Sequence, residues 1–305
     1  MLTRRELLLA TGATLALRSV VSRAVAGTGT ANRKPIPSSG EPLPVIGMGT
    51  WQTFHVGKDS GERAPLREVL RLFFDRGGTL IDSSPMYAEA EEVAGDLVAE
   101  LGEHRRMFAA TKVWTYGREA GIEQMERSMR RMRVEKMDLM QVHNLRDWRV
   151  HLPTLRLWKG EGRIRYIGIT TSNPGQYGEF AEVMASETLD FVQLNYDILT
   201  RGAEDVLLPL AEKRGMAVLV NRPFGGGDLF PRVRGRPLPD WATEFDCESW
   251  AQYFLKFVVS HPAVTCAIPA SSNPRHVADN MGAGFGRLPD AELRERMARH
   301  LEGLR

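Results

Sequence analysis

Short apolar runs alternate with charge-rich, amphipathic segments from Leu43 onward. The runs are nearly continuous in Val, Ile, Leu and Met, and most of them end in polar residues. Such continuity is typical of strands buried on both faces, as in a parallel sheet. Eight runs therefore predict eight strands: Pro44–Trp51, Thr79–Ser84, Met107–Trp114, Met137–Asn144, Arg165–Thr170, Phe191–Tyr196, Ala217–Phe224 and Val264–Ala270.

The segments between the runs place apolar residues at helical spacing. The clearest, Leu66–Phe74, is followed by Gly77 and Gly78, and glycine commonly ends a helix. Similar patterns predict helices in four further segments: Glu91–Val98, Ile122–Met132, Gln176–Ala185 and Glu204–Lys213.

A strand followed by a helix, repeated without an all-β stretch, predicts an α/β protein with a closed (β/α)8 TIM barrel. The rival is a doubly wound open sheet with a Gly-x-Gly-x-x-Gly turn after its first strand. The first run has Gly47 and Gly49 but lacks the third glycine. We therefore predict one barrel domain over residues 43–305, a length that suits this fold.

The first residues differ in character from the rest of the chain. Arg4 and Arg5 precede an apolar stretch that runs to Leu17, and Ala24-Val25-Ala26 offers a cleavage site of small residues. This order resembles a twin-arginine signal peptide, which exports proteins that are already folded. The stretch is too short for a permanent membrane anchor. We expect residues 1–26 to direct export to the periplasm through the twin-arginine machinery; a basic tail with a chance arginine pair is the alternative.

Residues 27–42 are rich in Gly, Pro, Ser and Thr and predict a linker. Hydrophobic content of 43% and charged content of 26% are ordinary for a soluble globular protein. The net charge of +2 is too small to indicate a surface for nucleic acid or anionic membranes. Cys247 and Cys266 have no metal or redox spacing, and no His/Asp/Glu cluster has ligand spacing, so we expect no metal.

Four ionisable residues follow the ends of three neighbouring strands. Asp82 ends the second apolar run and Tyr87 lies in the loop after it, while Lys112 ends the third run and His143 the fourth. Barrel active sites lie at the carboxyl ends of the strands, so we expect these side chains to share one mouth. Each has an ordinary structural explanation by itself, but the four are chemically complementary.

This set suits the reduction of a carbonyl group. Hydride addition produces an alkoxide, which must be protonated as it forms. A free tyrosine has a pKa of about 10 and a free lysine about 10.4. The Lys112 ammonium would favour the Tyr87 phenolate and so ease loss of the proton. Asp82 would keep the lysine charged, and His143 would hydrogen-bond the substrate oxygen.

Six segments, in order along the chain, resemble the aldo-keto reductase family. The likeness implies the same barrel, reduction of an aldehyde or ketone with a nicotinamide cofactor, and a catalytic tetrad of Asp82, Tyr87, Lys112 and His143 in which Tyr87 donates the proton. None of the four is substituted. The segments are Gly47–Trp51, Thr79–Tyr87, Ala110–Trp114, Arg127–His143, Arg163–Thr170 and Gln193–Tyr196.

The same resemblance suggests where the cofactor binds. Thr170, Thr171 and Gln193 match positions that bind the nicotinamide carboxamide. Gly225 and Gly226 match the loop that passes the pyrophosphate, where glycine lets the backbone come close. The residues that match the adenosine end are Ser271, Arg275, Asp279 and Asn280.

This chain departs from the family at the end of the seventh strand, where an aromatic ring usually lies under the nicotinamide. Asn221-Arg222-Pro223-Phe224 occupies that place. Either the planar guanidinium of Arg222 lies against the ring, or Phe224 serves, or hydride transfer is weakened.

A second departure concerns the basic pair that often grips the 2′-phosphate of NADPH. Ala270 and His276 stand at those positions, which leaves Arg275 and Ser271 as candidates. NADPH is the favoured cofactor, with NADH as the alternative.

Trp51 and Trp114 end strands that line the mouth, and by resemblance they would wall a pocket for an aromatic or aliphatic carbonyl. Core packing is the alternative for both. The sequence thus predicts an NADP(H)-dependent carbonyl reductase with a small-molecule substrate, no nucleic-acid partner and no stable membrane insertion. The rival is a nucleotide-binding accessory or redox-sensor barrel with little turnover. The intact tetrad counts against that rival. The replaced stacking residue and the export signal favour it, since free NADPH is scarce outside the cytoplasm.

Overall fold

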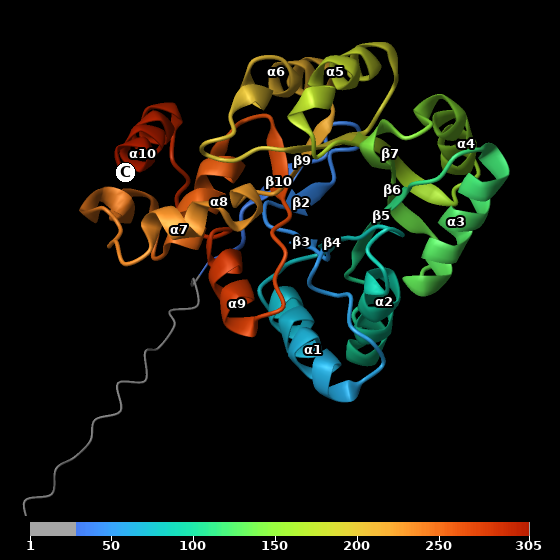
Figure 1. Cartoon of the computed structure of the whole chain (residues 1–305), viewed down its shortest axis with the longest axis horizontal. Coiled ribbons are helices and arrows are strands. Elements are labelled where there is room, and N and C mark those ends of the chain that lie inside the picture. The colour runs from blue at the N-terminus through green and yellow to red at the C-terminus, as the bar shows by residue number, and fades with distance from the viewer. Residues whose placement is uncertain (1–28, 305) are drawn as a thin grey trace, which may run out of the picture.

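The computed structural model describes residues 29–304 and has the predicted (β/α)8 barrel (Figure 1). Eight parallel strands lie side by side in chain order, and helices surround them. Parallel bridges from Ile46 to Ala267 and from Gly49 to Ala270 join the last strand to the first. The strands are β3 (Met48–Gly49), β4 (Leu80–Asp82), β5 (Phe108–Val113), β6 (Met137–Val142), β7 (Ile164–Thr170), β8 (Phe191–Asn195), β9 (Ala217–Asn221) and β10 (Val264–Ala267).

The helices follow the strands and cover the outside of the barrel (Figure 1). All five of the helical segments expected from the sequence are present. Two further helices, α7 and α10, lie outside the regular alternation. The helices are α1 (Ser60–Asp75), α2 (Ala90–Leu101), α3 (Arg118–Arg131), α4 (Trp148–Gly160), α5 (Tyr177–Ser186), α6 (Leu207–Arg214), α7 (Leu229–Val233), α8 (Trp250–Ser260), α9 (Pro274–Gly282) and α10 (Ala291–Gly303).

Helix α1 shows how the local sequence sets an element's ends. The Asp59 carboxylate accepts hydrogen bonds from the backbone N–H groups of Gly61 and Glu62, which satisfies two free donors of the first turn. The helix ends at Asp75, and Gly77 follows with a φ of +83°, a conformation that glycine adopts without strain.

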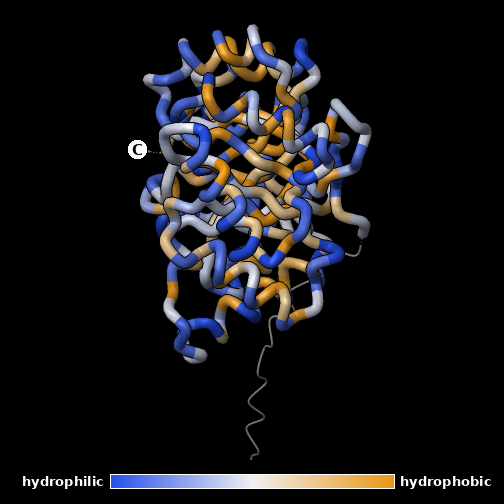
Figure 2. Tube along the Cα trace, turned by 90° about the vertical axis from the view of Figure 1, so that its right-hand side faces the viewer, coloured by the Kyte–Doolittle hydropathy of each residue, from blue (hydrophilic) through white to orange (hydrophobic). Residues whose placement is uncertain are grey.

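Two apolar cores hold the barrel together. The larger lies between the strands and the surrounding helices, and the smaller fills the barrel interior. Hydrophobic stretches accordingly run through the middle of the molecule in Figure 2, and most hydrophilic stretches lie at its outline. The interior core includes the first residues of four strands, Leu80, Phe108, Phe191 and Ala217. Their side chains fill the amino-terminal half of the barrel and leave its carboxyl end open for a site.

The segment expected as a linker forms part of the barrel's floor. Strands β1 (Arg33–Pro35) and β2 (Pro42–Pro44) pair as an antiparallel hairpin. Its Ile36 and Leu43 side chains belong to the interior core, which explains why this Gly/Pro-rich segment is ordered. The Lys34 ammonium donates hydrogen bonds to the His261 and Val264 carbonyl oxygens, both at 2.7 Å.

The proposed signal peptide lies outside the described residues. Within residues 29–304 no helix is long and apolar enough to cross a membrane. In the same part of the chain, no group of His, Cys, Asp and Glu side chains is arranged to hold a metal ion.

Candidate active site

The four ionisable residues expected at the barrel mouth lie together. Asp82 is the last residue of β4, Lys112 lies in β5, and His143 directly follows β6. The Tyr87 and His143 rings meet edge to face with centroids 5.9 Å apart, and the Lys112 ammonium lies 5.2 Å from the Tyr87 ring centroid. Neighbouring parallel strands thus deliver an acid, a phenol, an amine and an imidazole to one place.

A buried ion pair forms the base of this cluster. The Lys112 ammonium donates to Asp82 Oδ2 at 2.5 Å and to the Ser83 carbonyl oxygen at 2.7 Å. The other Asp82 oxygen accepts from the side-chain amides of Gln141 at 3.1 Å and Gln193 at 2.9 Å. Burial is the largest single influence on Lys112 and would lower its pKa, but Asp82 and Tyr87 together outweigh it and raise that pKa above its ordinary value. The lysine is therefore charged and fixed.

Two opposing influences set the acidity of Tyr87. Burial raises the pKa of Tyr87, and the Lys112 ammonium lowers it by less, so the net shift is upward. Lys112 thus acts in the expected direction and lowers the pKa of Tyr87, but burial outweighs it. The phenol keeps its proton at neutral pH and holds it ready for transfer.

His143 is a neutral imidazole with a partner on one nitrogen. Burial, together with the Lys112 and Arg146 charges, lowers the pKa of His143 well below its ordinary range. Its Nδ1 lies 2.9 Å from the Ser84 hydroxyl oxygen, which also accepts a long hydrogen bond from the Met86 N–H at 3.4 Å. In one of the two neutral tautomers of His143, Ser84 donates its proton to Nδ1. The hydrogen of the imidazole then lies on Nε2, where it can reach a substrate oxygen.

A cavity of about 490 Å³ opens above this cluster. Asp82, Tyr87 and His143 line it, whereas the Lys112 side chain is buried beneath. Trp51 lines the cavity as expected and is 40% exposed. Apolar walls also come from the rings of Phe224 and Phe230, whose centroids are 5.0 Å apart.

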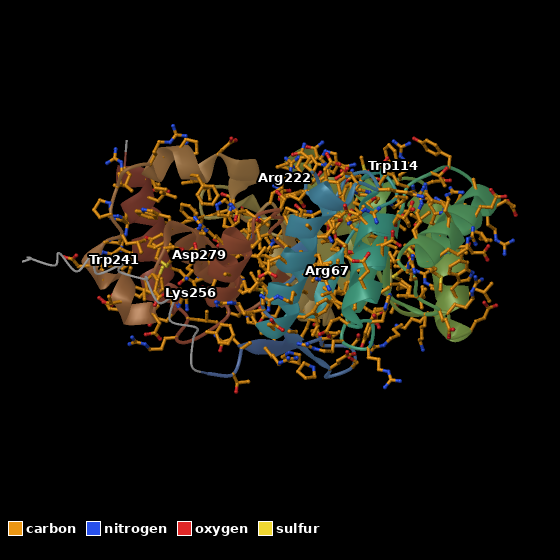
Figure 3. All side chains as sticks on the ribbon, turned by 90° about the horizontal axis from the view of Figure 1, so that it is seen from below. Arg67, Trp114, Arg222, Trp241, Lys256 and Asp279 are labelled. Atoms are coloured by element: carbon orange, nitrogen blue, oxygen red, sulfur yellow. The ribbon has the colours of Figure 1, made fainter. Side chains whose placement is uncertain are left out.

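Trp114 does not line this cavity but packs against the imidazole, with 6.4 Å between the Trp114 and His143 ring centroids. Figure 3 shows Trp114 and Arg222 along one edge of the molecule, with the β1–β2 hairpin along the opposite edge. Trp148 is the first residue of helix α4.

The residues matched to the nicotinamide carboxamide divide into two groups. Thr170 and Gln193 line the cavity. Thr171 does not: its hydroxyl bonds Gln176 Oε1 at 2.8 Å, and Ser172 lines the cavity in its place.

The turn after β9 carries both candidates for stacking on a nicotinamide. Arg222 and Phe224 both line the cavity. The Arg222 guanidinium lies 5.5 Å from the Trp51 ring centroid, and its backbone has a φ of +49°, which is uncommon for a residue other than glycine.

The glycine triplet that follows has three positive φ values, +61°, +73° and +110° for Gly225, Gly226 and Gly227. Residues with a side chain rarely adopt such φ values, which accounts for glycine at all three positions. Gly226 and Gly227 line the cavity, so backbone rather than side chain borders it here.

The four residues matched to the adenosine end lie beyond the cavity lining, which stops at Ala270. Arg275 is exposed in the first turn of α9, and Ser271 is buried in the turn before it. Asp279 already accepts hydrogen bonds at 2.8 Å from the Ser249 hydroxyl and the Gln252 side-chain amide, and Asn280 is buried.

Several polar residues of the site were not singled out from the sequence. The Gln141 side-chain amide donates a hydrogen bond to Asp82, and the Ser84 hydroxyl lies 2.9 Å from His143 Nδ1. Asn144 and Asn221 line the cavity, and each has a buried Oδ1 with no hydrogen-bond partner among the described residues. Their shared signal is a polar side chain within, or just after, an apolar strand run.

Comparisons with known proteins agree with this geometry. A model of the aldo/keto reductase family matches residues 45–297. A methylglyoxal reductase of Escherichia coli is 29% identical over 269 residues, which are 86% of this chain and 93% of that protein. The structure of an aldo-keto reductase from Bacillus halodurans has a TM-score of 0.72 at 22% identity, covering 89% of this chain and 96% of that one. An aldo-keto reductase from Klebsiella pneumoniae, solved in complex with NADPH, has a TM-score of 0.66 at 25% identity and covers 86% and 92%.

Proposed function

This chain belongs to the aldo/keto reductase family, and on that premise we propose that it reduces an aldehyde or a ketone to the alcohol with NADPH as the hydride donor. The observation that carries the proposal is the buried Asp82–Lys112 pair next to a protonated Tyr87 and a neutral His143, all at one cavity.

The cavity suits a nicotinamide in one specific respect. Asn144 and Asn221 present carbonyl oxygens that are buried without a donor among the described residues. An unsatisfied buried acceptor costs about 1–3 kcal/mol, so a ligand that supplies N–H donors is favoured there. A carboxamide NH₂ group is such a donor. Thr170 and Gln193 would complete its surroundings, and the Gly226–Gly227 backbone would border the phosphates.

The bound cofactor supplies the hydride, and the protein's residues handle the proton. His143 Nε2–H donates a hydrogen bond to the substrate oxygen and orients the carbonyl. The Tyr87 hydroxyl transfers its proton to that oxygen as negative charge develops on it. The Lys112 ammonium stabilises the phenolate that results, and Asp82 keeps the ammonium in place.

A turnover assay tests this function and separates it from the rival sensor. Purified protein is mixed with NADPH or NADH and a panel of aldehydes and ketones, and consumption of the reduced cofactor and formation of the alcohol are measured together. Multiple turnovers with stoichiometric alcohol support the reductase. Tight cofactor binding without turnover on any carbonyl would favour the sensor.

Cofactor preference has its own test. Arg275 and Ser271 are the groups left to contact a 2′-phosphate, and Arg275 is exposed at the start of α9. Losing a charged hydrogen bond costs about 1.5–3 kcal/mol, so Arg275→Ala should weaken NADPH binding by that amount and leave NADH binding nearly unchanged. An equal loss of affinity for NADPH and NADH would show that Arg275 does not contact the 2′-phosphate.

We also propose that residues 1–26 form a twin-arginine signal peptide and that the mature protein works in the periplasm. The support is the order of the Arg4-Arg5 pair, the apolar stretch and Ala24-Val25-Ala26. That export route carries folded proteins, so the cofactor can be bound before transport. A fusion to residues 1–27 should reach the periplasm with cleavage after Ala26, and replacing both arginines by lysine should retain it. Full-length protein confined to the cytoplasm would contradict this location.

A further inference from the structure

Three tryptophans near the barrel mouth each have an arginine guanidinium over the ring. The distances from the guanidinium carbon to the ring centroid are 4.1 Å for Arg146 on Trp114, 4.3 Å for Arg149 on Trp148, and 5.5 Å for Arg222 on Trp51.

Arg146 is the one held most firmly. Its guanidinium lies over Trp114 and also over Tyr116, at 4.8 Å from the second ring centroid. Stacking occupies the faces of the planar group and leaves the N–H donors at its edges free. No carboxylate, carbonyl or hydroxyl of the described chain accepts a hydrogen bond from the Arg146 side chain, and none pairs with its charge.

Arg146 is also close to the reacting groups. The Trp114 ring that carries it packs against His143, and the backbone N–H of Arg146 donates to the His143 carbonyl oxygen at 3.1 Å. Its positive charge is one of the causes of the low pKa of His143, so its field reaches the imidazole. The Arg146 guanidinium and the His143 imidazole therefore contact the same Trp114 ring.

The carboxylates near Arg146 accept hydrogen bonds from other groups. Asp147 Oδ2 accepts from the Gly117 N–H at 2.8 Å, and Glu179 Oε1 accepts from the Trp148 indole at 3.4 Å. Asp82, the one carboxylate among the residues found to line the cavity, is paired with Lys112. Among the described residues, none of Arg146, Arg149 and Arg222 has a salt-bridge partner.

We propose that Arg146 binds an anionic group of the substrate, a carboxylate or a phosphate, and that the preferred substrates are negatively charged aldehydes or ketones. This inference rests on the proposed reductase function, and it assigns that function a substrate class. The edge of the guanidinium takes the two oxygens of the anion while Trp114 and Tyr116 hold its plane.

The test compares matched pairs of carbonyl compounds that differ in charge. One pair is 4-oxobutanoate and its methyl ester, and the other is glyceraldehyde 3-phosphate and glyceraldehyde; together they distinguish a carboxylate from a phosphate. For the wild type we expect kcat/KM to be at least about tenfold higher for the charged member of one pair. Arg146→Gln should remove that preference through KM and change the uncharged member by about twofold or less.

Arg149→Gln is the matched control, because Arg149 also stacks on a tryptophan but on helix α4. It should keep the preference, and Arg146→Lys should keep part of it. If Arg146→Gln lowers both members of a pair equally, or if the wild type shows no preference in either pair, the inference is wrong.

A binding measurement keeps the two proposals apart. Titration with 4-hydroxybutanoate, followed by tryptophan fluorescence, should saturate with the wild type and be weakened about tenfold or more in Arg146→Gln. Binding of the anion without any turnover would count against the reductase and not against the anion site. Turnover without a charge preference would count against the anion site and not against the reductase.

Discussion

The Tyr87 phenol is subject to two opposing influences, burial and the Lys112 ammonium, and burial is the larger. The consequence is a proton donor that remains protonated until the substrate oxygen becomes basic. The ammonium then stabilises the phenolate only as it forms, which lowers the barrier without releasing the proton early. The pairing of Tyr87 with Lys112 was predictable from the strand ends. The direction of the net pKa shift of Tyr87 was not, because it depends on how deeply the phenol is buried.

Tyr87→Phe tests this role directly. The substitution removes the hydroxyl and keeps the ring, so we expect kcat to fall by about 10²–10⁴-fold while cofactor affinity stays within a few-fold. Tyr116→Phe, at a 67% exposed tyrosine, is the control: it keeps the ring that contacts Arg146 and should retain activity. A Tyr87→Phe enzyme with most of the wild-type rate on a good aldehyde would exclude Tyr87 as the proton donor.

Ser84 is expected to act through His143 by fixing which nitrogen carries the hydrogen. In Ser84→Ala that constraint is lost, and we expect kcat to drop by about tenfold, with KM changing less. ¹⁵N NMR of the imidazole should report a single Nε2–H tautomer in the wild type and a mixture in the variant. Ser84→Thr, which keeps the hydroxyl, should restore both readouts. A pure Nε2–H tautomer in Ser84→Ala would contradict this role.

At the residue scale, the chemistry at strand ends was predictable and the supporting hydrogen bonds were not. Asp82, Lys112 and His143 stand out because an ionisable side chain closes an apolar run. Gln141 lies inside such a run, and whether it faces Asp82 or the outer helices depends on the twist of the closed sheet. That orientation exists only once neighbouring strands are in register.

At the scale of elements, helices α2 and α3 approach closely at Gly95. A Cβ placed there would lie 2.1 Å from the Arg131 carbonyl oxygen and 2.8 Å from the Met132 Cα. Backbone atoms cannot move aside cheaply, so Gly95→Ala must push the two helices apart.

We expect Gly95→Ala to lower the free energy of unfolding by about 1–3 kcal/mol, measured by urea denaturation. Gly178→Ala in α5 is the matched control, since nothing lies within 4 Å of its added Cβ and alanine favours a helix. That variant should be as stable as the wild type or slightly more stable. Equal stability of Gly95→Ala and the wild type would show that the contact relaxes.

Element prediction succeeded where the sequence was periodic and failed where burial or tertiary contact set the structure. Helix α8 was not predicted from the sequence, and its run Gln252–Val259 is buried throughout. The β1–β2 hairpin has a linker's composition, and only the packing of Ile36 and Leu43 into the barrel orders it. The first apolar run contains only the two-residue strand β3, in which Gly49 lies close to the Ile268 carbonyl oxygen.

At the scale of the whole molecule, His261 links stability to pH. Burial and the Arg294 charge lower the pKa of His261 to about 4, and its Nδ1 accepts from the Ala263 N–H at 3.2 Å, which requires a neutral ring. Between about pH 6.5 and 4 the unfolded chain therefore binds more protons at this site than the folded one. The free energy of unfolding should fall as the pH is lowered through that window. Above the window, His261 should give it no pH dependence.

Thermal melts across pH 4–7 check this dependence. His261→Asn keeps an acceptor without titrating, so its melting temperature should fall less steeply with acid than that of the wild type. His276→Asn, at an exposed histidine of α9, should follow the wild-type slope. Identical slopes for all three proteins would assign acid sensitivity to other groups, His143 among them.

The closed floor of the barrel decides how this protein behaves when tethered. The described chain begins next to the β1–β2 hairpin. Lys34 of this hairpin donates a hydrogen bond to the Val264 carbonyl oxygen at the start of β10. The cavity opens at the opposite end of the strands (Figure 3). A bead, an electrode or a fused partner attached ahead of residue 29 would therefore hold the molecule by its base and leave the mouth facing the solution. An immobilised reductase oriented in this way would exchange substrate and product as freely as the dissolved one.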